Sequence, residues 1–138
     1  MLGLRTHSEE AYQKSLQLYL ATNNLKSAEK VIKKLLAADR NNPVTLLLLS
    51  QYYSSIKNNN EALKSLERAY EIGKILSIKG ELTSDIYETI LLNLIKLNIS
   101  YNNPQRAKEY ISELESIKPL SNQVENYIKE VKKKLSLT

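Results

Sequence analysis

The chain has 138 residues, a formal net charge of +5 and no cysteine. This length fits one domain with a substantial core, and the missing cysteines exclude disulfides, thiolate catalysis and cysteine-ligated zinc. Gly and Pro occur only three times each, which leaves little room for tight β-turns or glycine-rich phosphate-binding loops. Phe and Trp are absent, so tyrosine supplies all the aromatic packing.

Apolar residues recur with a helical period along the whole chain, as residues 25–36 and 120–135 illustrate. Alternation typical of a strand never persists over four residues, so the sequence predicts an all-α fold. Linkers of two to seven residues favour antiparallel neighbours. We predict seven helices, near residues 7–22, 25–38, 43–57, 60–76, 84–101, 104–116 and 121–136.

The breaks between the predicted helices are short and rich in asparagine. An asparagine side chain can accept a hydrogen bond from a free amide at a helix start, and asparagine also tolerates a left-handed backbone. Asn42-Pro43 and Asn103-Pro104 are typical of an N-cap followed by a proline in the first helical position. Asparagine pairs or triplets occur at 23–24, 58–60 and 102–103, while Gly80 lies in the only long break.

Three alanines have matching surroundings and define an internal repeat. Ala28, Ala62 and Ala107 each lie four residues after an asparagine and four residues before a large aliphatic residue. The first two alanines are 34 residues apart and the next two are 45 apart. A helix–turn–helix period of 34 residues with this alanine resembles the tetratricopeptide repeat.

The resemblance implies a helical-hairpin repeat array with a right-handed superhelix. One domain, 1–138, would hold three repeats near 8–42, 43–78 and 84–119, followed by a capping helix at 121–136. The longer second period implies an insertion of eleven residues, which we expect between Ile75 and Asp85. In the third repeat Asn98 stands where the family has an aromatic residue, and Pro119 is its closing proline.

The sequence contains no residue pattern typical of a catalytic or metal-binding site. His7 is the only histidine and has no neighbouring residue to orient it as a base. Glu9 and Glu10 are better explained as carboxylates that favour the positive end of a helix dipole. We therefore expect no enzymatic activity, no metal and no cofactor.

The family resemblance places a binding groove on the concave face, which the first helix of each repeat lines. The runs 44–49 and 90–99 are apolar on more than one face, which indicates either helices buried all round or a partly apolar groove. At the positions of a basic carboxylate clamp known in some relatives, this chain has Gln13, Gln17, Leu48, Thr89 and Asn93, of which only Asn93 fits. The predicted groove residues are Gln13, Gln17, Leu47, Gln51, Ser54, Ser55, Leu92, Lys96 and Ile99.

These observations predict a protein–protein interaction scaffold that binds a peptide or helix of a partner in the groove. Self-association through the repeat ends, giving a homo-oligomer, is an alternative. A basic helical RNA-binding module is another, based on lysines at 26–40 and 118–138, but aromatic interleaving is missing. No apolar stretch approaches the roughly 20 residues that span a bilayer. We expect a cytoplasmic location, with a removed signal or anchor left open.

Overall fold

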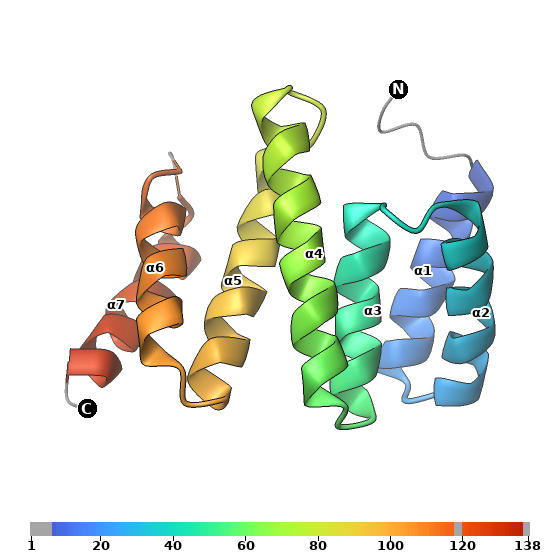
Figure 1. Ribbon diagram of the computed structural model, residues 1–138, viewed down its shortest axis with the longest axis horizontal. Coiled ribbons are helices and arrows are strands. Elements are labelled where there is room, and N and C mark those ends of the chain that lie inside the picture. The colour runs from blue at the N-terminus through green and yellow to red at the C-terminus, as the bar shows by residue number, and fades with distance from the viewer. Residues whose placement is uncertain (1–6, 118–119, 137–138) are drawn as a thin grey trace. The chain divides into compact units, whose positions relative to one another are not determined.

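The computed structural model of the chain describes residues 7–117 and 120–136, which form seven α-helices and no strand (Figure 1). The all-α prediction is confirmed, and each helix end lies within two residues of its predicted position. Pro119, the predicted closing proline, lies outside the described residues. The helices are α1 His7–Ala21, α2 Leu25–Ala38, α3 Pro43–Ser55, α4 Asn59–Ile78, α5 Ser84–Ser100, α6 Pro104–Glu115 and α7 Asn122–Ser136.

The helices belong to two compact units, Met1–Ile90 and Leu91–Thr138, with the boundary inside α5. In the first unit, α1 pairs with α2 and α3 pairs with α4, and the two hairpins pack side by side (Figure 1). Leu16, Leu35 and Leu66 are fully buried between them. This core follows from the apolar stripe that the helical period places on one side of each helix.

The repeat alanines lie at close helix contacts. Ala28, Ala62 and Ala107 are each 0% exposed. In the second hairpin, Ser50 Oγ donates a 2.8 Å hydrogen bond to the carbonyl oxygen of Ala62. A small residue on each helix therefore lets α3 and α4 approach closely, as the repeat pattern predicts.

Three of the hairpin loops share one backbone geometry. Asn23, Lys57 and Asn102 adopt left-handed φ angles of 59°, 61° and 57°. The asparagine that follows each of them donates its amide to the carbonyl five residues earlier, at 2.7–2.9 Å, which is the main bond of a Schellman motif. Left-handed asparagine was predicted for these breaks, whereas the use of a lysine in the middle loop was not.

The predicted asparagine N-caps are confirmed in three places. The side-chain oxygens of Asn24, Asn42 and Asn58 accept hydrogen bonds from amides of the helices that follow them. Asn103 was expected to do the same, but its side chain makes no capping bond. Its φ is −121°, against −88° at Asn24 and −91° at Asn58.

The insertion in the second period lengthens two helices instead of forming a long loop. α4 has 20 residues where α2 has 14, and α5 has 17 where α3 has 13. The linker 79–83 is one residue longer than the linker 39–42, so these three differences account for the eleven extra residues. They lie around the predicted stretch 75–85, where Ile75 and Ile78 remain exposed on the extended end of α4.

Side chains of α4 and the first turns of α5 hold these two lengthened helices together. The rings of Tyr70 and Tyr87 stack with their centroids 6.1 Å apart, an arrangement that adds to the burial of both rings. Gly73 is buried one turn further along, and a Cβ there would lie 3.3 Å from the Cδ1 atom of Ile90. The glycine therefore leaves room for the Ile90 side chain against α4.

The second unit consists of the second half of α5 with α6 and α7. Leu91, Leu94 and Ile95 are fully buried on α5, and Leu114 is fully buried on α6. α7 contributes one buried stripe, while its lysines are exposed. This amphipathic arrangement is what a terminal helix needs to cover an apolar face and present a polar one to solvent.

Asn98 leaves a polar atom of the second unit without a hydrogen bond. The side chain is 1% exposed, and its Nδ2 donates to the carbonyl of Leu94 at 2.8 Å. Its Oδ1 is buried and accepts no hydrogen bond from the part of the chain that the structure describes. An unsatisfied buried acceptor costs about 1–3 kcal/mol.

We expect Asn98→Leu to raise the free energy of unfolding by about 1 kcal/mol, because leucine has the same branched arrangement of four side-chain heavy atoms and removes the unsatisfied oxygen. Urea denaturation followed by circular dichroism measures the change. Asn98→Ala is the control, since it removes the same oxygen but leaves a cavity and should not stabilise the protein. A less stable leucine variant would mean that Oδ1 is satisfied in solution.

Candidate binding groove

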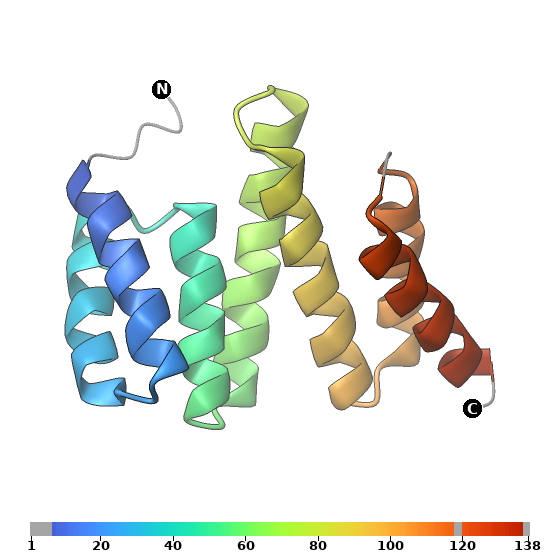
Figure 2. The same cartoon turned by 180° about the vertical axis from the view of Figure 1, so that it is seen from behind.

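The first unit has a concavity of about 380 Å³ lined by three helices. Figure 2 shows α1, α3 and the start of α5 on the near side, with α2 and α4 behind them. These three are the first helices of consecutive hairpins, and they run in the same direction. The lining residues are Glu10, Gln13, Lys14 and Gln17 of α1, Val44 and Leu47 of α3, and Asp85, Ile86 and Thr89 of α5.

Apolar side chains form the floor of the concavity. Val44 and Ile86 are half-buried, and Leu47 is 8% exposed. Gln13 is also buried, and its Nε2 donates to Thr45 Oγ1 at 3.1 Å. This hydrogen bond between two buried side chains fixes α1 against α3, so the wall and floor of the groove have a defined spacing.

Charged side chains lie on both sides of this floor. On α1, Lys14 Nζ lies 3.9 Å from Glu10 Oε1, with side chains 76% and 47% exposed. Such an exposed pair contributes little to stability. On α5, Asp85 is exposed in the first helical turn, where a carboxylate interacts favourably with the positive end of the helix dipole.

The structure places the predicted groove residues in three groups. Gln13, Gln17 and Leu47 line the concavity together. Gln51, Ser54 and Ser55 are exposed further along α3, beyond the lining, and Ser55 Oγ donates to the carbonyl of Gln51 at 3.0 Å. The remaining three belong to the second unit and are Leu92, Lys96 and Ile99.

In the second unit, Lys96 and Ile99 line a hollow of about 250 Å³ that α7 completes. The ammonium of Lys96 lies 5.5 Å from the ring centroid of Tyr127, which is within the range of a cation–π interaction. Burial raises the pKa of the Tyr127 hydroxyl. Leu92 is half-buried and does not line this hollow.

The prediction missed several lining residues, including Glu10 and Lys14 on α1 and Val44 on α3. Each lies three or four residues from a predicted groove residue, so the helical period alone would have added them. Asp85 and Ile86 were missed because they lie in the four residues by which the start of α5 extends beyond that of α3.

Burial explains the apolar run on α3. The consecutive residues Leu46, Leu47, Leu48 and Leu49 are between 2% and 8% exposed, because α3 packs against α1, α2 and α4. Of the two interpretations that the sequence left open, the structure therefore favours a helix buried on more than one face. Leu48 occupies a clamp position and is too buried to contact a ligand's carboxylate.

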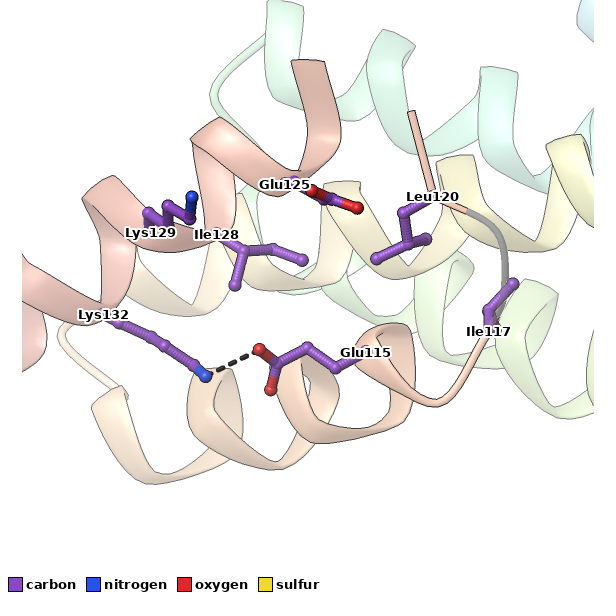
Figure 3. Close-up of a pocket in the computed structure, with 7 residues that line it drawn as sticks. All are labelled: Glu115, Ile117, Leu120, Glu125, Ile128, Lys129 and Lys132. Carbon is purple, nitrogen blue, oxygen red and sulfur yellow. Dashed lines mark hydrogen bonds and ion pairs between the residues drawn. The ribbon is translucent and has the colours of Figure 1, made fainter. Parts of the chain in front are cut away.

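A hollow of about 550 Å³ in the second unit lies between the end of α6 and α7 (Figure 3). Lys132 Nζ and Glu115 Oε2 form an ion pair of 2.6 Å at its edge. Ile117, Leu120 and Ile128 supply its apolar side chains. Its charges are mixed, since Lys129 and Glu125 also line it.

No group of three or more His, Cys, Asp or Glu side chains suited to a metal ion occurs within residues 7–117 and 120–136. No helix among the residues with a described structure is long and apolar enough to cross a bilayer.

Consecutive helix pairs, each with a buried alanine on its second helix and with a groove on their first helices, define a helical-hairpin repeat protein. The sequence model of the tetratricopeptide repeat matches residues 9–42 and 44–82, more than half of the chain. The chain belongs to the tetratricopeptide repeat family, whose members are generally non-enzymatic protein–protein interaction modules. No curated protein matches it. The match to the repeat's sequence model covers the first two predicted repeats. The third repeat, 84–119, stays a prediction.

Proposed function

We propose that this chain is an adaptor that binds a peptide or short helix of a partner protein in the groove of α1, α3 and the start of α5. The observation that supports this function most directly is that three consecutive first helices contribute to one concavity. A partly apolar floor with polar walls suits a peptide or an amphipathic helix.

We also propose that residues 84–119 are a third repeat and that 121–136 are the capping helix. The α5–α6 loop supports this, because its Asn102 repeats the left-handed geometry of the two earlier loops. Ala107 is fully buried, as are the two alanines of the matched repeats. The buried stripe of α7 has the character of a terminal helix.

The groove can be blocked without disturbing the core. Gln17 and Thr89 both line it and are exposed, so we expect Gln17→Arg combined with Thr89→Arg to fold normally and to lower partner capture about tenfold, a loss of about 1.4 kcal/mol. The measurement is quantitative mass spectrometry of proteins retained by the immobilised full chain. The matched control, Ala37→Arg with Asn60→Arg, places two arginines on exposed positions of the second helices.

Equal capture by the groove variant and the control would contradict the proposed function. Capture that disappears on nuclease treatment and falls steeply with salt would indicate RNA binding instead, because nucleic-acid binding releases counterions. Light scattering of the purified chain tests the self-association alternative. A dimer that survives the double arginine change would place self-association outside the groove.

A further inference from the structure

The sign of the charge in the groove is opposite to that of the whole chain. The lining carries two carboxylates, Glu10 and Asp85, and one ammonium, Lys14, so its net charge is −1 in a chain of net charge +5. Lys14 and Glu10 are 3.9 Å apart and compensate each other. The Asp85 carboxylate forms no ion pair with any residue of the described ranges.

The two carboxylates also stand on opposite sides of the apolar floor. Glu10 belongs to α1 and Asp85 to α5, while Val44 and Leu47 of α3 lie between these helices. Ile86 follows Asp85 directly and extends the apolar floor on the α5 side. A ligand that covers this floor with an aliphatic side chain therefore brings its neighbouring residues close to a carboxylate on one side or the other.

We infer that the partner segment which fits this groove carries an aliphatic side chain with an adjoining lysine or arginine. This inference rests on the proposed function and gives it a chemical class of ligand. The aliphatic side chain covers Val44 and Ile86, and the adjoining cation lies next to Asp85. An acidic segment would place its carboxylate beside Asp85 in a partly desolvated site, which disfavours binding because the like charges repel.

Short capped peptides test this charge preference on the intact chain. The probes are acetyl-Lys-Leu-Lys-amide and acetyl-Glu-Leu-Glu-amide, titrated into the ¹⁵N-labelled protein while amide chemical shifts are recorded by NMR. We expect the lysine probe to shift amides in 10–17, 44–47 and 85–89 and to bind at least about fivefold more tightly than the glutamate probe. Raising the salt concentration should narrow this difference, because salt screens exposed charges.

Two variants test whether Asp85 causes the preference. Asp85→Asn keeps the shape of the side chain and should lower the ratio of the two affinities about two- to fivefold, the range expected of an exposed pair. The matched control is Glu71→Gln, which removes an exposed carboxylate from α4, outside the groove. This control should leave the ratio unchanged.

The outcomes separate this inference from the proposed function. Equal binding of the two probes, or an affinity ratio that Asp85→Asn leaves unchanged, would overturn the inference. If partner capture still depended on Gln17 and Thr89, the proposed function would survive that result. Probe-induced shifts that map outside the groove, together with capture that the arginine variant leaves intact, would overturn both.

Discussion

Replacing Leu47 with glutamate is expected to unfold the first unit. The side chain is 8% exposed and lies within a run of four buried leucines on α3. A carboxylate at this position would lose most of its hydration, and burying a charge costs several kcal/mol. A loss of this size approaches the whole stability of a small domain. Thermal denaturation followed by far-ultraviolet circular dichroism measures it.

The control for Leu47→Glu is Gln51→Glu, which introduces the same charge one turn further along α3 at an exposed position. It should change the free energy of unfolding by less than about 0.5 kcal/mol. A Leu47→Glu protein that melts at the wild-type temperature would show that the Leu47 side chain faces solvent in an open groove, contrary to its burial here.

Replacing Ala62 with leucine is expected to destabilise the second hairpin. Ala62 is 0% exposed, and its carbonyl accepts the hydrogen bond from Ser50 Oγ. The larger side chain has no free volume at this helix contact and must push α3 from α4, which typically costs about 1–3 kcal/mol. In a unit of this size we expect the melting temperature to fall by at least about 4 °C.

Ala37→Leu is the matched control for this substitution, because Ala37 is exposed near the end of α2. Leucine and alanine are both good helix formers, so the control should stay close to the wild type. If Ala62→Leu were as stable as Ala37→Leu, the alignment of the repeats on their alanines would be wrong.

The helices and their contacts could be predicted from the sequence because local chemistry determines them. The helical period gave all seven helices of the described ranges, and asparagine and proline gave the starts of α2, α3, α4 and α6. Ala28, Ala62 and Ala107 could be assigned to close contacts because each recurs in the same local pattern. All three are fully buried.

The lining of the groove could be predicted only in part, because it depends on how each helix is rotated about its axis. α3 is surrounded by three helices, so its apolar pattern does not identify an open side, and Leu47 was assigned to the groove although it is nearly buried. Asp85 could not be predicted because it lies in the extra turn of α5. The residue type also does not determine whether an asparagine before a helix makes a capping hydrogen bond, and the side chain of Asn103 makes none.

The groove joins segments that are far apart in the sequence, namely residues 10–17, 44–47 and 85–89. In a repeat protein each hairpin contacts mainly its neighbours. The outer helices can therefore unfold while the remaining helices stay folded. A bound peptide that touches all three segments would couple their unfolding, and at a concentration of 100 times its Kd it would stabilise the folded state by about 2.7 kcal/mol. Cellular proteases remove mainly unfolded copies, so the abundance of this protein would then follow the abundance of its partner.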